Sequence, residues 1–304
     1  MGSRIERLDR LDPEQVRAVT RLVDAVTDAD GVRPLSEHVM LHLRHGGDDP
    51  TRNFLQYDGD ELVGYAHLDV SDPVEGPSAE LTVAPHARRR GHGRALVDAL
   101  LDESGGNLRL WAHGEGDAAR ALAGKLGFRQ DRVLWQMRRS LYAPLPEPRL
   151  PAGITIRTFV VGRDEEGWVA VNARAFAEHP EQGTWTIEDL RLREREPWFD
   201  ASGFFLAEHG DDLVGFHWTK VHGADGSHHH EPIGEVYVVG VDPSMQGKRL
   251  GPALTLVGLR HLRARGLSQV MLYVDETNTP AIGIYEELGF ARWDTDLCYR
   301  KTAG

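Results

Sequence analysis

Two short loops in this chain combine glycine with Lys or Arg directly before a helix, a pattern that can bind phosphate. The first lies in "LTVAPHARRRGHGRAL" (Leu81 to Leu96) and the second in "VYVVGVDPSMQGKRLGPALT" (Val236 to Thr255). In both, an apolar strand pattern ends at a proline and a helical pattern follows. The first turn of a helix has N–H groups without intrahelical partners, and glycine lets an anion approach them. The glycine spacing alone is weak evidence, because similar loops occur in purely structural turns.

The loops belong to a longer internal repeat whose blocks recur in the same order. The hairpin pattern "DGDELVGYAHLDV" returns as "HGDDLVGFHWTKV", and the later strands "LRLWA" and "VMLYV" are each followed by a helix that ends at Gly127 or Gly289. Between the copies, "YAPLPEPRLPAG" is too rich in proline for a helix or a central strand. We therefore predict two tandem α/β domains with mixed sheets: an N-terminal domain at 1–142, a linker at 143–152 and a C-terminal domain at 153–304.

Length and composition restrict the class of protein. The 304 residues suffice for about two domains, and no apolar run reaches the ~18 residues of a membrane span. A net charge of −12 argues against nucleic acid, and the single cysteine, Cys298, fits a reducing cytoplasm. We expect a cytoplasmic monomer with no nucleic-acid or membrane partner. The run "SHHHEP" at His228 to Glu231 is expected to be a solvated loop, and no metal site is predicted.

The combined pattern resembles a known superfamily. A strand, a proline, (Gln/Arg)-x-x-Gly-x-Gly, a helix, a strand, Asn-x-x-Ala and a closing Leu-Gly-Phe are similar to the GNAT acetyltransferases, whose loop holds the pyrophosphate of acetyl-CoA. Four segments also resemble the mycothiol-forming branch of this superfamily: "PLSEHVMLHLRHGG", "NARAFAEHPEQGTW", "GFHWTKVH" and "GEVYVVGVDP". The tandem members of this branch acetylate the cysteinyl amine of a cysteinyl-glucosaminyl-inositol. One residue departs from the pattern: Arg249 stands where the first glycine is usual. We expect Arg249 to keep a negative φ and to place its guanidinium near the phosphates.

The resemblance implies that acetyl-CoA is the co-substrate and that both halves have residues to bind it. In the first half the implied residues are Leu81, Thr82, Val83, Arg89, Arg90, Gly91, His92, Gly93 and Arg94. In the second half they are Val239, Gly240, Val241, Gln246, Gly247, Lys248, Arg249, Leu250, Gly251, Pro252 and Asn278.

The proton carriers differ between the halves. The implied reaction is attack of an amine on a thioester, and an α-amine with a pKa near 8 is mostly protonated at neutral pH, so a base is needed. The resemblance assigns Glu235 as general base, Tyr285 as general acid and the Val241 N–H as donor to the thioester oxygen. Aligned by sequence, the first half has Pro77 and Ala123 in place of Glu235 and Tyr285. We therefore expect catalysis in the C-terminal half alone, unless Glu235 is merely an exposed strand carboxylate and Tyr285 a core aromatic.

A polyhydroxylated substrate with a cationic amine should be bound by carboxylates, hydroxyls and a lysine. Family positions that match here are Glu37, Glu181, Lys220, Glu235 and Tyr273. Glu37 could instead be an ordinary acid at a helix N-terminus, and Lys220 a solvated strand end. Two other functions stay open: acetylation of another small amine, such as an amino sugar or a protein N-terminus, and non-catalytic sensing of acetyl-CoA.

Overall fold

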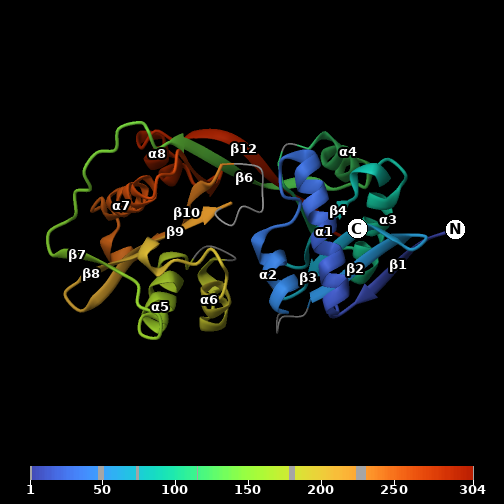
Figure 1. Cartoon of the computed structure of the whole chain (residues 1–304), viewed down its shortest axis with the longest axis horizontal. Coiled ribbons are helices and arrows are strands. Elements are labelled where there is room, and N and C mark those ends of the chain that lie inside the picture. The colour runs from blue at the N-terminus through green and yellow to red at the C-terminus, as the bar shows by residue number, and fades with distance from the viewer. Residues whose placement is uncertain are drawn as a thin grey trace. The chain divides into compact units, whose positions relative to one another are not determined.

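The computed structural model describes residues 2–46, 51–72, 75–114, 116–177, 182–223 and 231–303 (Figure 1). The chain divides into two compact units. Unit 1 comprises Met1–Leu134 and Asp294–Gly304, and unit 2 comprises Trp135–Trp293. In the described part of the chain, no helix is both long enough and apolar enough to cross a membrane.

Unit 1 is built on a mixed sheet with the strand order β1-β2-β3-β4-β5-β12. Strands β1 to β4 are antiparallel neighbours, β4 and β5 are parallel, and β12 runs antiparallel to β5. Two helices precede β2, α3 connects β4 to β5, and α4 follows β5 (Figure 1). The elements are β1 Ser3–Leu8, α1 Pro13–Asp30, α2 Glu37–His45, β2 Thr51–Asp58, β3 Glu61–Asp69, β4 Ser78–Val83, η1 Pro85–Ala87, α3 His92–Glu103, β5 Leu108–Ala112, α4 Asp117–Lys125, β6 Arg129–Ser140 and β12 Ala291–Lys301.

Unit 2 repeats this arrangement with the strand order β7-β8-β9-β10-β11, followed by β6 beside β11. Strands β7 to β10 are antiparallel neighbours, and β10 and β11 are parallel. The remaining elements are β7 Ile154–Thr158, α5 Glu165–Ala175, η2 Gln182–Thr184, α6 Ile187–Glu194, η3 Ala201–Gly203, β8 Phe204–His209, β9 Asp212–His222, β10 Ile233–Val241, η4 Pro243–Met245, α7 Leu250–Ala264, β11 Gln269–Asp275 and α8 Thr279–Glu287. The predicted pair of α/β domains with mixed sheets is confirmed.

The last strand of each half continues from one unit into the other. Strand β6 begins in unit 1 and continues from Trp135 into unit 2, where it neighbours β11. Strand β12 begins in unit 2 and continues from Asp294 into unit 1, where Leu297 to Lys301 pair with β5. Each sheet is therefore completed by a strand that sequence order assigns to the other half of the chain.

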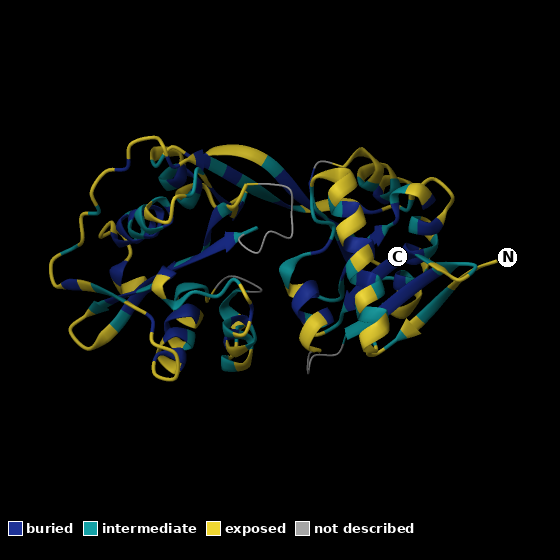
Figure 2. Ribbon diagram, in the orientation of Figure 1, coloured by how far each residue is buried: buried dark blue, intermediate teal, exposed yellow. Residues whose placement is uncertain are grey.

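Local sequence signals explain where the helices begin and end. The Asp12 side chain accepts hydrogen bonds from the N–H groups of Glu14 and Gln15, and the Asp12 N–H donates to the Gln15 side chain, which forms a capping box at the start of α1. Gly127 and Gly289 have φ values of 78° and 84°, so they end α4 and α8 in the left-handed conformation that glycine tolerates. The predicted glycine stops are confirmed. Figure 2 shows buried residues along the central strands and exposed residues on the outward sides of the helices.

The sheet of unit 2 separates two apolar layers. On one face, Trp168 of α5 and Leu190 of α6 pack with Trp218 and Val238. On the other face, α7 and α8 pack with a second cluster that includes Val236. Because successive side chains of a strand alternate between faces, this division tells which side of the sheet each residue of β9 and β10 occupies.

Candidate active site

Strand β10 has an open edge beside β11. The two strands pair at Gly234 with Val270 and at Glu235 with Met271, and among the described residues no further β10–β11 pair follows. On its other edge, β10 stays paired with β9 as far as Val241. The strands therefore diverge immediately after Glu235. This divergence leaves backbone groups of β10 available to an extended ligand.

The backbone of Val241 points to this open edge. Asp242 donates its N–H to the carbonyl of Val214 on β9. Since backbone N–H groups alternate between the two edges of a strand, the N–H groups of Val241 and Val239 are directed away from β9. Val239, Gly240 and Val241, which the sequence suggests for cofactor binding, thus lie along the open edge.

The second glycine loop ends at the N-terminus of α7. Gly247 has φ 76°, and the exposed Arg249 is the N-cap residue of α7, directly before Leu250. Among the described residues, no acceptor is found for the N–H groups of Gly247, Arg249, Leu250 and Gly251. Backbone amides without acceptors at a helix N-terminus favour an anion. Gln246 and Lys248 are exposed in the same loop, the Leu250 side chain is buried, and Pro252 has no N–H to offer.

The prediction of a negative φ at Arg249 is wrong. Arg249 has φ 62° and ψ 23°, which is the left-handed conformation. In the loop of unit 1 the arginine comes first and the glycine second, whereas unit 2 has the opposite order: Arg89 has φ 64° and Gly91 has φ 93°. Each loop therefore contains two left-handed positions, one occupied by glycine and one by arginine. The sequence pattern failed here because it shows which residue occupies a turn and not which φ the turn requires.

Glu235 is a buried carboxylate next to the divergence of the strands. Its side chain is 9% exposed, and its Oε2 lies 2.6 Å from Nε2 of His222, the last residue of β9. Lys220 is its direct partner in the β9–β10 register. A buried carboxylate with one hydrogen-bond partner and a lysine opposite is a group that can accept a proton. Glu235 is thus not the exposed strand carboxylate that the sequence left open as an alternative.

A bulge at Tyr237 determines which face Glu235 occupies. The β9–β10 register shifts between Val236 and Val238. Both Tyr237 and Val238 consequently lie on the α5/α6 face, whereas Val236 lies on the α7/α8 face. Alternation then places Glu235 on the α5/α6 face, two residues before Tyr237.

Two further residues that the resemblance assigns to substrate binding, Lys220 and Tyr273, lie on β9 and β11. Lys220 is buried, and its Nζ lies 4.2 Å from the ring centroid of Trp198 and 5.0 Å from that of Tyr237. It is therefore not a solvated strand end. Tyr273 is 40% exposed on β11, and its hydroxyl accepts a hydrogen bond from Gln136.

Glu37 and Glu181 lie elsewhere in the chain. Glu37 is the first residue of α2 in unit 1, where an acid is favourable at a helix N-terminus, so its part in a site of unit 2 stays a prediction. Glu181 lies outside the described residues, as does the histidine run at 228–230. In the part of the chain that the structure describes, no cluster of His, Cys, Asp or Glu could hold a metal ion.

Tyr285 lies on α8 within the core of the α7/α8 face. It is 9% exposed and meets Phe290 edge to face at 5.8 Å between ring centroids. Burial raises the pKa of Tyr285 to about 12, so the phenol keeps its proton at neutral pH. The residue thus has both a packing role and a proton to donate. Asn278 caps the same helix by accepting a hydrogen bond from the Ala281 N–H, and its exposed amide group lies at the start of α8.

Unit 1 has an open strand edge and a glycine loop before a helix like those of unit 2. Strands β4 and β5 pair from Ser78 to Glu80, so Leu81, Thr82 and Val83 lie along an open edge of β4. The loop after β4 again lacks described acceptors for the N–H groups of Gly91, His92 and Gly93. The His92 side chain is buried, so His92 has its backbone to offer, whereas Arg89, Arg90 and Arg94 are exposed.

The strand register corrects the sequence alignment of the two halves. Lys220 pairs with Glu235 in unit 2, and the equivalent pair in unit 1 is Asp69 with Ser78. The residue that replaces Glu235 is therefore Ser78 rather than Pro77. The alignment was wrong by one residue because β10 contains the bulge at Tyr237 and β4 pairs with β3 without a register shift.

A buried ion cluster occupies the α2 side of unit 1. His113 lies 2.9 Å from Asp296 on β12 and 3.3 Å from Glu80 on β4, and Glu80 also accepts a hydrogen bond from the Ser36 N–H. Burial opposes the charged imidazole, but the two carboxylates outweigh it and raise the pKa of His113 to about 10. Unit 1 thus contains a buried ion cluster at Glu80, two residues beyond Ser78, the register equivalent of Glu235.

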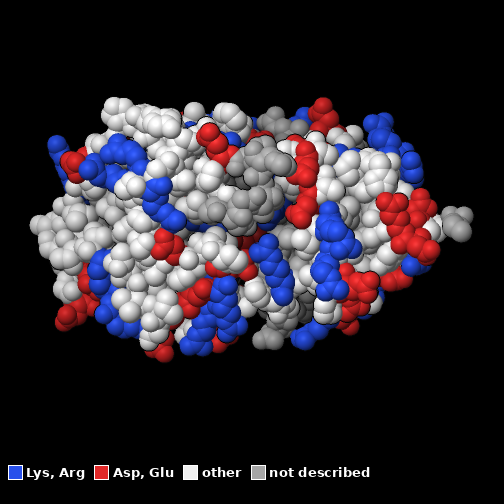
Figure 3. Space-filling model, in the orientation of Figure 1, with Lys and Arg blue, Asp and Glu red and all other residues white. Residues whose placement is uncertain are grey.

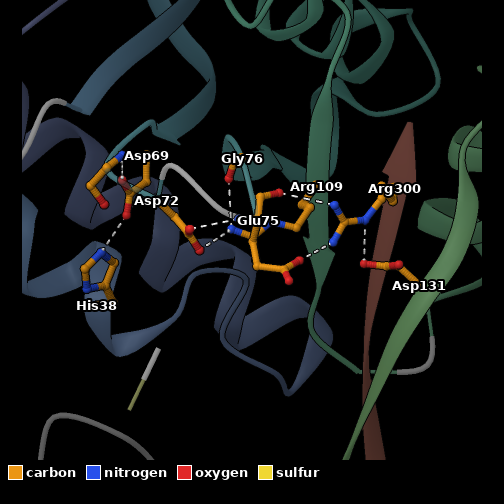
Figure 4. A network of polar contacts seen from close by, with 9 residues as sticks. His38, Asp69, Asp72, Glu75, Gly76, Arg109, Asp131 and Arg300 are labelled. Carbon is orange, nitrogen blue, oxygen red and sulfur yellow. Dashed lines mark hydrogen bonds and ion pairs between the residues drawn. The ribbon is translucent and has the colours of Figure 1, made fainter. Parts of the chain in front are cut away.

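A second polar network ties β12 to unit 1 (Figure 4). Arg300 of β12 donates to the side chains of Glu75 and Asp131, and the buried Arg109 of β5 donates to Gly76 and Asp72. Cys298 of β12, which pairs with Trp111 of β5, is fully buried, as the sequence predicts for a structural thiol. In the view of Figure 3, acidic and basic side chains are interspersed.

Comparison with known proteins agrees with this geometry. A sequence profile described as the acetyltransferase (GNAT) family matches residues 20–128 and 170–290. The chain therefore belongs to the acetyltransferase (GNAT) family, with one copy of the family domain in each half. Relatives from Streptosporangium roseum and Acidothermus cellulolyticus, both named mycothiol acetyltransferase, are 58% and 60% identical to it. These alignments cover 99% and 98% of this chain and 100% and 94% of the relatives.

Solved structures show the same tandem fold. A GCN5-related N-acetyltransferase from Sphaerobacter thermophilus is 25% identical, with a TM-score of 0.66 over 98% of this chain and 95% of that one. A tandem GNAT protein from the clavulanic acid biosynthesis pathway is 18% identical, with a TM-score of 0.73 over 100% of this chain and 99% of that one.

Proposed function

We propose that unit 2 transfers the acetyl group of acetyl-CoA to the cysteinyl amine of 1D-myo-inositol 2-(L-cysteinylamino)-2-deoxy-glucopyranoside, the last step in mycothiol biosynthesis. The observation that carries this proposal is the buried Glu235 beside the point where β10 and β11 diverge. The names of the relatives that align over nearly the whole chain support the choice of acceptor.

The geometry suggests how acetyl-CoA binds. The pyrophosphate would accept hydrogen bonds from the amides at the start of α7, with Arg249 close by. The pantetheine arm would lie along the open edge of β10 and pair with the backbone of Val239 and Val241. This directs the thioester along β10 toward the divergence. Val241 lies six residues beyond Glu235 on β10, so a thioester within reach of Glu235 would take its hydrogen bond from an open-edge N–H nearer to it, such as that of Val239.

Proton transfer follows from the positions of Glu235 and Tyr285. Glu235 removes a proton from the ammonium group on the α5/α6 face, and the nitrogen attacks the thioester carbon. The second N–H proton, which the tetrahedral intermediate loses, goes to solvent. The carbon–sulfur bond then breaks, and Tyr285 supplies a proton to the departing thiolate from the α7/α8 side. Tyr285 afterwards regains a proton from solvent, so the net products are the N-acetyl compound and free CoA. The register position equivalent to Glu235 in unit 1 is occupied by Ser78, which has no carboxylate. We therefore propose that the N-terminal domain, 1–142, binds acetyl-CoA without turnover.

Steady-state kinetics tests the acceptor. The purified chain should show a kcat/KM at least about tenfold higher for the cysteinyl pseudodisaccharide than for glucosamine, free cysteine or peptide amines. The reason is that the proposed substrate-binding residues would bind the hydroxyl groups of a polyhydroxylated amine. A smaller preference would favour a tandem acetyltransferase of another amine. Acetyl-CoA binding without turnover of any amine would instead favour a sensor.

A further inference from the structure

The base Glu235 has a hydrogen-bond partner on the neighbouring strand that the sequence did not single out. His222 ends β9 and pairs in register with Ile233, so its ring reaches diagonally to Glu235, two residues further along β10. The Nε2–Oε2 distance is 2.6 Å. Strand alternation could have revealed the contact, since Lys220 and His222 are two residues apart and share a face.

The two members of this pair differ in their access to solvent. The Glu235 side chain is 9% exposed and the His222 side chain 36% exposed. Any proton that Glu235 receives from the amine must leave before the next catalytic cycle. The imidazole connects the buried carboxylate to the surface, and imidazole is the side chain that gains and loses a proton near neutral pH.

The charged groups on the same face of the sheet do not replace His222 in this role. Lys220, opposite Glu235, has its Nζ over the rings of Trp198 and Tyr237. Arg193 of α6 donates from Nε to the Tyr237 hydroxyl at 2.8 Å. Lysine and arginine side chains act as donors, so among the described residues the acceptor next to the carboxylate is the imidazole.

We propose that His222 is a positioning residue for Glu235 and carries its proton to solvent. The hydrogen bond holds Oε2, which leaves Oε1 for the amine. While Glu235 is ionised, the Nε2–H of His222 donates this bond. After the amine proton has bonded to Oε1, exchange with water moves the ring proton from Nε2 to Nδ1, and the carboxyl group turns its O–H toward Nε2. The O–H bond then breaks, an N–H bond forms at Nε2, and Nδ1 releases its proton to water. This inference rests on the proposed function, because it takes Glu235 as the base of acetyl transfer.

Variants of His222 separate this role from simple packing. His222→Ala should lower kcat about 10- to 100-fold with little change in the KM for acetyl-CoA, and added imidazole should restore much of the lost rate. His222→Gln can still donate a hydrogen bond but cannot relay a proton, so its kcat should also fall and its pH–rate profile should change. The matched control is His86→Gln, which removes an exposed His–Glu pair in unit 1. This variant should keep the wild-type kcat and pH–rate profile.

Two results would overturn the proposal. One is a His222→Gln variant with the wild-type kcat and pH–rate profile. The other is a His222→Ala variant whose rate imidazole does not raise. Nuclear magnetic resonance tests the pair without turnover: the Nε2 resonance of the His222 ring should shift in the Glu235→Gln variant, and an unchanged resonance would show that the pair does not form. If the wild-type chain acetylates no amine, the proposed function fails, and the resonance still decides whether the pair exists.

Discussion

In the proposed function, single side chains decide which unit can perform chemistry. Glu235 and Ser78 occupy equivalent register positions, yet one is a buried carboxylate beside an imidazole and the other is a hydroxyl. The proposed general base thus depends on one residue type at one position. The resemblance assigns Glu235 as the base, but it does not single out His222, because the diagonal contact becomes visible only once the register of β9 and β10 is known.

The buried His113 gives unit 1 a pH-dependent stability. Its pKa of about 10 lies above the ordinary imidazole value near 6.5, so the folded chain holds the proton more tightly than the unfolded chain. The stability that this histidine contributes is therefore fully present below about pH 6.5 and is lost as pH rises toward 10. The free energy of unfolding of unit 1 should fall over this window, and the fall should be smaller in His113→Gln.

Chemical denaturation at several pH values, with a probe in unit 1, measures this difference. Resonances of the His113 ring provide a second measurement that does not require the variant to fold. A ring that titrates near pH 6.5 in the folded wild-type chain would contradict the account.

At the scale of elements, the loops before α3 and α7 show what a sequence pattern can and cannot predict. The strand, proline, loop and helix were placed correctly, because hydrophobic periodicity and proline report local structure. The left-handed φ of Arg249 and the bulge at Tyr237 were missed. Both depend on hydrogen bonding and packing with neighbouring strands, which no single residue type encodes.

Arg249→Gly tests the loop geometry. Glycine removes a left-handed penalty of roughly 1–2 kcal/mol, partly offset by its greater freedom in the unfolded chain, so the free energy of unfolding should rise by up to about 1 kcal/mol. Loss of the guanidinium should raise the KM for acetyl-CoA by about three- to tenfold. Denaturant titration and steady-state kinetics measure the two effects, with Arg89→Gly as the equivalent change in unit 1. A clearly destabilised Arg249→Gly chain would be inconsistent with strain at this position.

At the scale of the whole molecule, the repeat was predictable and its final strands were not. The order of the repeated blocks indicated two domains, but the pairing of β12 with β5 joins residues about 190 positions apart in the chain, as in Leu297 with Ala112. Such pairings leave no local signal. The ion pairs of Asp296 and Arg300 show how unit 1 holds this distant strand.

Both units should bind acetyl-CoA, because each has an open strand edge and a loop with unpaired amides. Isothermal titration calorimetry of the Glu235→Gln chain should give two molecules of acetyl-CoA per chain. A stoichiometry of one, abolished by changes in the α7 loop, would show that unit 1 has lost binding as well as catalysis.

The central claim is that both units bind the coenzyme and that a carboxylate found only at the Glu235 position drives acetyl transfer. The most direct measurement compares kcat for the cysteinyl pseudodisaccharide in Glu235→Gln and in Ser78→Ala, the matched change in unit 1. We predict a fall of about 10²- to 10³-fold for Glu235→Gln, with acetyl-CoA binding retained, and no change for Ser78→Ala. Wild-type kcat in Glu235→Gln, or an equal loss in both variants, would contradict the account.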